Sequence, residues 1–430
     1  MALTGKRTFV GFGLGPIQAG LFLYEAYHCG SFGRLVAGEV LPEVVSAVRR
    51  TGGRYSLNIA HRDRVEICTV GPVEIYNPAS PVDVQELVEA VAEAEEISTA
   101  VPSVHHYVTP GPGSIHRILA EGLRRKAAQG GSRTVIYAAE NHNHAAEILE
   151  AAVLEEVLAA EKIAVRAQVC FLNTVIGKMS GVATERAKIQ SGRLAPVTPQ
   201  ANRAFLVEAF NRILVSKVRF ESPHYERGLT VFEEKEDLLP FEEAKLYGHN
   251  ATHALAAYLG TLRGLERIAD LRQFPALLDF VRAAFLEESG AALIRKHRGK
   301  DRLFTHEGYR EYAEDLLERM TNPHLVDTVE RVGRDPQRKL GWDDRLIGTM
   351  RVALEQNVTP RRFALGAAAA MGMLEPGIFE STRSASSLLE PLWGKTATGS
   401  QEGARILKLI EDGRRRLRRW RDSGFEDFDE

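Results

Sequence analysis

The order of patterns in the first forty residues restricts the fold of this chain most. A short apolar run at 7–12 leads into Gly13-Leu14-Gly15-Pro16, then a helix-like stretch reaches Cys29. A second apolar run at 34–37 ends beside Glu39. Strand, glycine turn, helix, strand and acid follow one another as in a βαβ unit that binds a dinucleotide. This order predicts a parallel sheet with a ligand at the carboxyl end of its first strand.

The glycine turn supplies the candidate cofactor-binding residues. Gly13 would permit the tight turn, and Gly15 would let the backbone approach a pyrophosphate. That pyrophosphate would rest on the helix N-terminus at Pro16 and Ile17. Glu39 is placed to bind the ribose hydroxyls and to repel a 2′-phosphate, which favours NAD over NADP.

The fingerprint of this turn is incomplete. Counted from Gly13, the position of the third glycine is occupied by Gln18, and Gly20 follows two residues later. The third glycine serves close packing of helix on strand, so Gln18 affects local geometry more than phosphate contact. A register that uses Gly11, Gly13 and Gly15 is a second interpretation, and a structural turn without a nucleotide is a third.

Strand-like and helix-like segments keep alternating as far as residue 175. A hairpin pattern covers 54–60 and 64–70, after which strand-like segments at 97–101, 134–138 and 164–175 alternate with helix-like 82–95, 114–128 and 143–160. Alternation of this kind predicts a mostly parallel sheet with helices on both faces. We therefore expect an α/β N-terminal domain of the Rossmann type over residues 1–200.

Helical periodicity dominates the second half of the chain. It covers 201–214, 239–263, 275–296, 307–320, 343–355 and 360–372, which predicts a mainly α-helical substrate domain over 201–380. A C-terminal extension, 381–430, would follow it. Residues 380–402 are rich in Ser and Thr, which predicts a long loop. Residues 403–420 have the pattern of a basic amphipathic helix.

Charge and cysteine content exclude several classes of protein. With 55 Lys and Arg against 57 Asp and Glu, the net charge of −2 gives no reason to expect nucleic acid as a partner. The three cysteines lie far apart, and no His, Cys and Asp cluster has ligand spacing, so we expect reduced thiols and no metal. The glycine-broken N-terminal run and the lack of about 18 consecutive apolar residues predict a cytoplasmic protein without a signal peptide or membrane span.

Lys245, Asn250 and His253 lie in a stretch, 242–260, that reads as one continuous helix. With α-helical geometry, Asn250 lies about 140° and His253 about 80° around the axis from Lys245, so all three share one broad face. A neutral lysine can accept a hydroxyl proton, an amide can stabilise an oxyanion, and an imidazole can orient either partner. The alternative is an amphipathic helix with a surface lysine, a satisfied asparagine and a packed histidine.

The spacing Lys-x-x-x-x-Asn-x-x-His resembles the signature of the polyol-specific long-chain dehydrogenase/reductase family. The resemblance runs from about residue 7 to 375, and segments 287–297 and 322–348 are similar to its mannitol-1-phosphate 5-dehydrogenase branch. It implies a zinc-independent, NAD-dependent enzyme, a monomer or homodimer, in which Lys245 is the general acid and base. The implied reaction interconverts mannitol 1-phosphate and fructose 6-phosphate. The alternatives are an unphosphorylated polyol or keto-hexuronate as substrate, or a non-catalytic NAD(H)-binding sensor.

The resemblance also implies site roles for Glu140 and Asn141, which follow the strand-like segment 134–138. Glu140 would lie at the cofactor, and Asn141 would form an oxyanion hole together with Asn250. Two amide donors on one oxygen would stabilise alkoxide character in the transition state. Considered without the resemblance, Asn141 is a helix cap.

The resemblance implies that Arg331 and Lys339 bind the substrate, and Asn173 is a further candidate for this role. Arg side chains suit bidentate binding of phosphate, although a solvated basic turn would have the same composition. The family's Asp-Arg pair after Asn173 is replaced by Gly177 and Lys178. This departure bears on which polyol is recognised.

Overall fold

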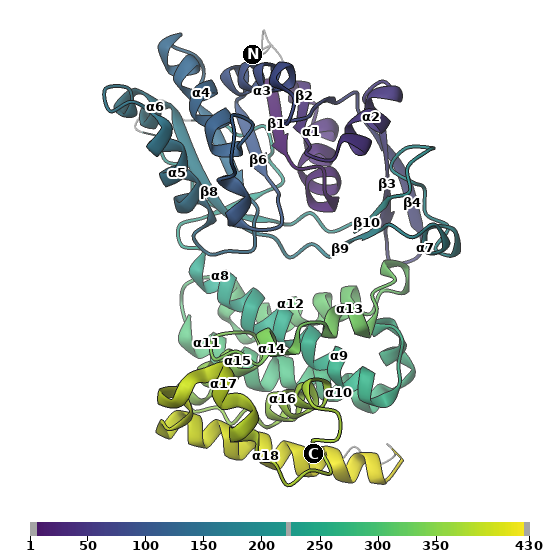
Figure 1. The fold of residues 1–430 in the computed structure, drawn as a ribbon. Coiled ribbons are helices and arrows are strands. Elements are labelled where there is room, and N and C mark those ends of the chain that lie inside the picture. The colour runs from purple at the N-terminus through teal and green to yellow at the C-terminus, as the bar shows by residue number, and fades with distance from the viewer. Residues whose placement is uncertain (1–6, 221–224, 425–430) are drawn as a thin grey trace. The chain divides into compact units, whose positions relative to one another are not determined.

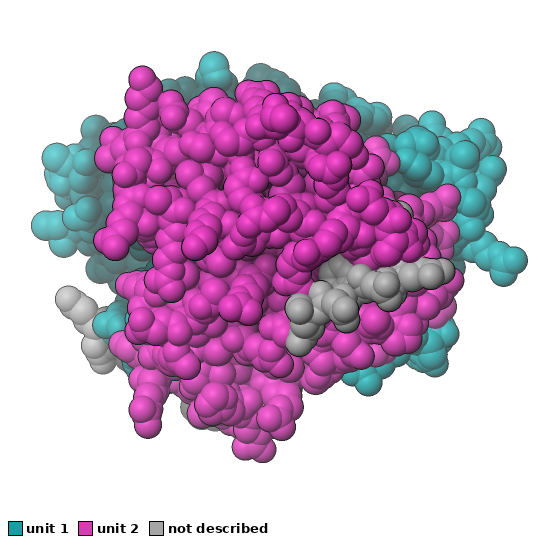
Figure 2. Space-filling view, turned by 90° about the horizontal axis from the view of Figure 1, so that it is seen from below, with its two compact units in different colours: residues 1–239 teal, residues 240–430 magenta. Residues whose placement is uncertain are grey.

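The computed structural model describes residues 7–220 and 225–424, and the chain divides into two compact units, Met1–Leu239 and Pro240–Glu430 (Figures 1 and 2). The N-terminal run from which we predicted the absence of a signal peptide begins in residues 1–6, which lie outside the described residues. The domain boundary expected at residue 200 lies inside unit 1. Three strands beyond that residue belong to sheets of unit 1, as the pairing below shows.

An eight-stranded sheet, of which Figure 1 labels β1, β2, β6 and β8, forms the centre of unit 1. Its strand order is β12-β11-β8-β7-β6-β1-β2-β5. Its six parallel strands are β1 (Arg7–Phe12), β2 (Phe32–Gly38), β5 (Glu74–Tyr76), β6 (Glu96–Thr99), β7 (Thr134–Ala138) and β8 (Val169–Val175). The chain proceeds outward from β1 through β2 to β5, then returns to β6 on the other side of β1. The predicted Rossmann-type arrangement is therefore confirmed, with its switch point between β1 and β6.

Helices cover both faces of this sheet because successive residues of each buried strand point to opposite sides. Val10, Ile97 and Ile136 pack with α3 and α4, whereas Phe9 packs with the first helices and the second sheet. The helices of unit 1 are η1 (Gln18–Phe22), α1 (Leu23–His28), α2 (Pro42–Arg50), α3 (Pro81–Glu93), η2 (Val104–Tyr107), α4 (Ile115–Ala128), α5 (Ala145–Glu156), α6 (Lys162–Gln168) and α7 (Arg186–Ser191). The strand expected over 164–175 is thus shorter, since α6 occupies its first part.

A second sheet of four strands, in the order β4-β3-β10-β9, packs against η1. The hairpin predicted from alternation is β3 (Tyr55–Ala60) with β4 (Val65–Val70), and β9 (Ser180–Ala183) and β10 (Ala204–Glu208) complete the sheet. The helix expected over 201–214 is wrong. All five residues of β10 are buried, and a short run that is apolar on both faces has no period that separates a helix from a central strand.

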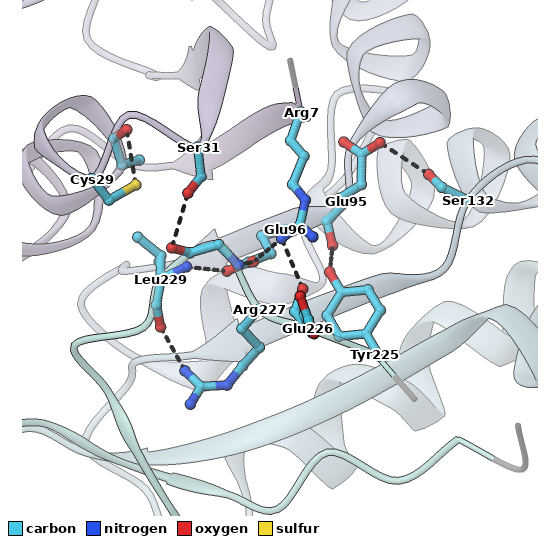
Figure 3. Close-up of polar contacts among 12 residues, drawn as sticks. Arg7, Cys29, Ser31, Glu95, Glu96, Ser132, Tyr225, Glu226, Arg227 and Leu229 are labelled. Carbon is cyan, nitrogen blue, oxygen red and sulfur yellow. Dashed lines mark hydrogen bonds and ion pairs between the residues drawn. The ribbon is translucent and has the colours of Figure 1, made fainter. Parts of the chain in front are cut away.

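The last strands of unit 1 are β11 (Leu214–Ser216) and β12 (Glu233–Lys235), and the segment between them is fastened to the start of β6 (Figure 3). The fully buried carboxylate of Glu96 accepts hydrogen bonds from the Tyr137 hydroxyl at 2.8 Å and from the backbone N–H groups of Gly228 and Leu229. The Arg227 guanidinium donates to the Leu229 carbonyl at 2.7 Å. These bonds tie residues 227–229 to β6 and β7.

Unit 2 is a set of packed helices, as predicted (Figure 1). Its helices are α8 (Leu239–Glu243), η3 (Ala244–Asn250), α9 (Ala251–Arg263), η4 (Ile268–Gln273), α10 (Pro275–Ala283), η5 (Ala284–Gly290), α11 (Ala291–Lys296), η6 (Arg302–Phe304), α12 (His306–Met320), η7 (Pro323–Leu325), α13 (Val329–Gly333), α14 (Pro336–Lys339), α15 (Ile347–Glu355), α16 (Arg361–Leu374), α17 (Ala385–Thr398) and α18 (Gln401–Asp422). No helix within 7–220 and 225–424 is long and apolar enough to cross a membrane.

The C-terminal extension packs within unit 2. The loop expected over 380–402 is largely helix α17, which Ser384 caps and which kinks at Gly394, where φ is 78°. Its Trp393 indole donates to the Leu340 carbonyl at 2.7 Å. The predicted amphipathic helix is confirmed as α18, which lies on α16 where Gly413 permits close approach to Leu365.

Candidate functional site

The glycine turn after β1 has the shape that a dinucleotide pyrophosphate requires. Gly13 has a φ of +83°, and its N–H donates to the Gly38 carbonyl at 2.7 Å. A Cβ on Gly13 would lie 2.9 Å from the Ala100 carbonyl oxygen, whereas one on Gly15 would meet no atom within 4 Å. Gly13 therefore fixes the turn, and the open space over Gly15 fits close approach of a phosphate.

The structure explains why Gln18 is tolerated where a third glycine was expected. Gln18 is fully buried at the start of η1, and its Oε1 accepts a hydrogen bond from the Ser98 hydroxyl at 2.9 Å. A Cβ on Gly11 would lie 2.0 Å from its Nε2, so Gly11 makes room for the longer side chain. The register that begins at Gly11 stays a second interpretation, with Gly11 next to the last residue of β1. Gly20 supplies the close packing, since a Cβ there would lie 2.6 Å from Val207.

Glu39 lies against the same turn. Its buried carboxylate accepts a hydrogen bond from the Leu14 N–H at 2.7 Å and another from the Leu41 N–H at 2.9 Å. The acid expected at the ribose therefore also joins the glycine turn to the loop that follows β2. Pro16 and Ile17 begin the helix after the turn, as predicted.

Glu140 joins the ends of two neighbouring strands, β6 and β7. Its carboxylate accepts from the Thr99 hydroxyl and the Val101 N–H, both at 2.9 Å, and from the buried Tyr107 hydroxyl. Burial raises the pKa of this carboxyl, against the effect of those donors. Asn141, the next residue, is exposed at the carboxyl end of β7. Glu140 thus positions the strand ends beside which Asn141 stands.

Asn173 and Lys178 are engaged by the protein itself. The Asn173 amide caps α5, since its Oδ1 accepts from the Ala146 N–H at 2.9 Å and its Nδ2 donates to Glu147 at 2.8 Å. The Lys178 ammonium, which stands where the family has Arg, donates to the Phe210 carbonyl at 3.0 Å. Both side chains stabilise the neighbourhood of β8.

The helix with Lys245, Asn250 and His253 is continuous, as predicted, but it contains a π-helical turn. This turn is η3, which lies between α8 and α9 and includes Lys245 and Asn250. In a π-helix the backbone bonds run from residue i to i+5, so residues five apart become neighbours along the axis. The separation of about 140° that α-helical geometry gave is therefore wrong, because the wider turn brings Asn250 closer to Lys245.

Lys245 has the protonation behaviour that a general base requires. Burial, and then the positive charge of Arg345, lower its pKa to about 8, although Glu242 opposes this. The Asn250 side chain is half-buried and has no hydrogen-bond partner within the described part of the chain. An amine and an unengaged amide thus lie together on one helix turn.

His253 lies against a residue that sequence reasoning missed. Its Nε2 lies 3.4 Å from Oδ2 of Asp327, whose Oδ1 accepts from Nε of Arg331 at 2.7 Å. Burial works against ionisation of Asp327, but His253 and Arg331 outweigh it and lower the pKa of this carboxyl. Asp327 is itself fixed, because its carbonyl accepts from the Ile268 N–H at 2.9 Å. His253, Asp327 and Arg331 therefore lie in a row, with Asp327 between the imidazole and the guanidinium. The only signal for Asp327 in the sequence was its place four residues before Arg331.

His249, to which the sequence assigned no role, lies beside His253 with ring centroids 6.1 Å apart. Burial and then the neighbouring His253 keep the pKa of His249 well below its ordinary value. Lys339 is also buried, and burial with the charge of Arg345 lowers its pKa to about 8. Arg345 is thus a common neighbour of Lys245, His249 and Lys339 that sequence reasoning did not single out.

Across residues 7–220 and 225–424, no three His, Cys, Asp or Glu side chains gather closely enough to hold a metal ion. The chemistry of unit 2 is instead that of a lysine, two imidazoles and amide and guanidinium donors. Such a set can move a proton to or from an oxygen and stabilise negative charge on it.

Two family models together match most of the chain. The model of the mannitol dehydrogenase Rossmann domain matches residues 7–225, and that of the mannitol dehydrogenase C-terminal domain matches residues 237–404. The resemblance stated from the sequence is therefore confirmed.

Curated relatives cover the same span. The mannitol-1-phosphate 5-dehydrogenase of Bacillus licheniformis is 32% identical over 365 residues, which are 84% of this chain and 86% of the relative. The protein of the same name from Pseudarthrobacter chlorophenolicus is 33% identical over 305 residues, 70% of each chain.

Solved structures share the fold. A D-sorbitol dehydrogenase in substrate-free form superposes with a TM-score of 0.75 at 17% identity, covering 98% of this chain and 94% of the other. The ternary complex of Pseudomonas fluorescens mannitol 2-dehydrogenase with NAD and D-mannitol gives a TM-score of 0.69 at 16% identity, covering 98% and 93%.

Proposed function

Because this chain belongs to the mannitol dehydrogenase family and is an NAD-dependent oxidoreductase of polyol CH–OH groups, we propose that it interconverts mannitol 1-phosphate and fructose 6-phosphate. The observation that carries the proton transfer in this proposal is Lys245, whose pKa of about 8 makes both protonation states accessible near neutral pH. The names of relatives that match most of the chain support the phosphorylated substrate.

Unit 1 would hold the cofactor through the turn after β1. The open space over Gly15 and the positive φ of Gly13 fit a pyrophosphate, and Glu39 is close enough to the turn to serve the ribose. NAD supplies the hydride acceptor for polyol oxidation, and NADH the donor for ketose reduction. The carboxylate of Glu39 would disfavour a 2′-phosphate at this position, which agrees with NAD as cofactor.

Unit 2 would supply the proton transfers. In polyol oxidation the neutral amine of Lys245 would take the hydroxyl proton, and in ketose reduction its ammonium would return a proton to the carbonyl oxygen. The unengaged amide of Asn250 would donate to that oxygen as negative charge develops, with Asn141 as a second amide donor. His253, oriented by Asp327, would hold the oxygen or Lys245 in place.

A second substrate assignment rests on Gly177. The family's acidic residue at this position lies close to the substrate, and its replacement by glycine leaves an unphosphorylated polyol or a keto-hexuronate as the alternative. The proton transfers by Lys245 would be the same for either substrate.

The two assignments separate in one assay of NADH oxidation, with fructose 6-phosphate, fructose and tagaturonate offered in parallel. Turnover with fructose 6-phosphate alone supports the mannitol-1-phosphate assignment, and turnover only with fructose or tagaturonate replaces it. Lys245→Ala should lower kcat by about a hundredfold or more with NADH binding retained. Lys296→Ala, which removes an exposed lysine paired with Glu243 at 2.9 Å, is the matched control.

A further inference from the structure

Hydrogen bonds connect the segment around Arg345 to two neighbouring helices. The Thr349 hydroxyl lies 2.5 Å from the Arg345 carbonyl oxygen and 3.1 Å from the carbonyl oxygen of Tyr247, inside the π turn. The Leu346 N–H donates to the Lys339 carbonyl at 3.3 Å. The segment that carries Arg345 therefore links the helix of Lys245 to the helix of Lys339.

The side chain of Arg345 is mostly buried, and its guanidinium is only partly paired. Its side chain is 14% exposed, and its Nε lies 2.9 Å from Oδ1 of Asp344. Within residues 7–220 and 225–424, its terminal nitrogens Nη1 and Nη2 have no hydrogen-bond partner. Arg331 differs, since it is 44% exposed and places both Nε and Nη2 at 2.7 Å from Asp327. Of these two arginines, Arg345 has the donors available for a ligand.

Positive charge is concentrated around this side chain. The charge of Arg345 depresses the pKa of Lys245, His249 and Lys339, which shows that all three lie within its electrostatic reach. Asp344 lies 2.9 Å from Arg345 and 3.9 Å from Arg338, and Arg338 is also paired with Asp335 at 3.2 Å. Unlike the buried polar atoms that lack a partner, the terminal nitrogens of Arg345 retain exposure, so an anion can reach them.

A buried hydroxyl in the same neighbourhood also lacks an acceptor. The Tyr258 hydroxyl has no hydrogen-bond partner within the described part of the chain, and the charges of Arg345 and Asp335 both influence it. Guanidinium and hydroxyl donors without acceptors are what a bound oxyanion satisfies.

We propose that Arg345, with Lys339 beside it, binds the anionic group of the keto-sugar substrate, a phosphate or a carboxylate, through its two terminal nitrogens. This inference rests on the proposed function, because it names the substrate class of that same site. It assigns Arg331 a different task, which is to hold Asp327 in place for His253.

The first test is independent of turnover. Inorganic phosphate is titrated calorimetrically into the full-length protein, Arg345→Gln, Arg345→Lys and the control Arg338→Gln. We expect Arg345→Gln to weaken phosphate binding by about tenfold or more, because a hydrogen bond to a charged group contributes about that much. Arg345→Lys should weaken it less, and Arg338→Gln should leave it unchanged. Equal affinity in the parent and Arg345→Gln overturns the proposal.

The second test compares substrates in NADH oxidation. Loss of Arg345 also changes the charge near Lys245, which affects every ketose alike, so the informative quantity is a ratio of kcat/KM values. For Arg345→Gln, the ratio of fructose 6-phosphate or tagaturonate to fructose should fall by about tenfold or more. The fructose 6-phosphate arm identifies a phosphate and the tagaturonate arm a carboxylate. An unchanged ratio overturns the proposal.

Failure of this inference and failure of the proposed function give different results. Turnover of fructose 6-phosphate that survives Arg345→Gln with its preference intact keeps the function and removes Arg345 as the anion ligand. Phosphate binding that depends on Arg345, without NADH oxidation by any of the three ketoses, keeps the anion site and removes the proposed reaction.

Discussion

The depressed pKa of Lys245 has a direct consequence for the pH dependence of the reaction. Oxidation of a polyol needs the neutral amine, and reduction of the ketose needs the ammonium. At pH 7 an amine with a pKa of about 8 is about 9% neutral, against about 0.03% for a lysine at its ordinary value of 10.5. Burial and Arg345 thus raise the population of active base about 300-fold, which corresponds to about 3 kcal/mol.

The assay is kcat/KM for both directions across the range from about pH 6 to 10. Polyol oxidation should rise about tenfold per pH unit below a pH of about 8 and level off above it. Ketose reduction should be constant below that pH and fall above it. Opposite limbs with the same midpoint are the signature of a single group that donates in one direction and accepts in the other.

Lys126 provides the matched control. It is buried in unit 1, donates to the Thr134 hydroxyl at 2.7 Å, and has its pKa lowered by burial to about 8, as in Lys245. Lys126→Met should leave the midpoint of the pH profile of kcat/KM unchanged. The residual activity of Lys245→Ala should no longer rise or fall with pH around that midpoint. If Lys126→Met moves the midpoint, or if Lys245→Ala retains it, another group governs the profile and the reasoning from Lys245 is refuted.

Three further changes test other parts of the molecule. Asp327→Asn removes the charge that orients His253 and should lower kcat by about tenfold or more, measured by steady-state kinetics with NAD binding retained. Glu39→Ser removes the carboxylate beside the glycine turn and should raise the ratio of NADP to NAD turnover. Glu288 of η5 is buried against the start of α16. Burial raises its pKa to about 7 from 4.5, so between these pH values the folded state holds a proton that the unfolded state has lost. The stability that this proton supplies is fully present below about pH 4.5 and is lost by about pH 7, up to about 3 kcal/mol. Glu288→Gln should abolish that slope in chemical denaturation.

Each of these three has a comparison that can contradict it. Asp335→Asn changes an exposed aspartate of the same segment, and an equal loss of kcat there would leave Asp327 without a special role. An unchanged cofactor ratio in Glu39→Ser would separate Glu39 from the ribose. A stability slope between pH 4.5 and 7 that persists in Glu288→Gln would have to come from another carboxyl.

Several features of the fold were predictable because they depend on local pattern. The order of strand, glycine turn, helix and strand over 7–38 predicted the switch point at β1, and alternation predicted the hairpin of β3 and β4. The prediction of a helix over 201–214 failed because an apolar run with both faces buried has no informative period. The prediction of a loop over 380–402 failed because packing of Trp393 against the Leu340 carbonyl stabilises a helix of weak local preference.

The residues of the site divide in the same way. Lys245, Asn250 and His253 could be found from the sequence because their spacing within one helix carries the chemistry. Their actual relation depends on the π turn, which the sequence pattern does not distinguish from an α turn. Glu39 was likewise found from its distance along the chain, but its bond to the Leu14 N–H was not.

The sequence by itself determined the class of the protein: a dinucleotide-binding sheet, a helical second half, and a lysine, an amide and an imidazole on one helix. Only the tertiary structure decided which charges surround them. It placed Asp327 at His253, engaged Arg331 with that carboxylate, and brought Arg345 to Lys245 and Lys339. Periodicity and spacing describe neighbours within one element, whereas these pairings arise from the packing of helices that are remote in sequence. The pKa of a lysine depends on those remote neighbours and on burial, so the chemistry of Lys245 is set by the fold.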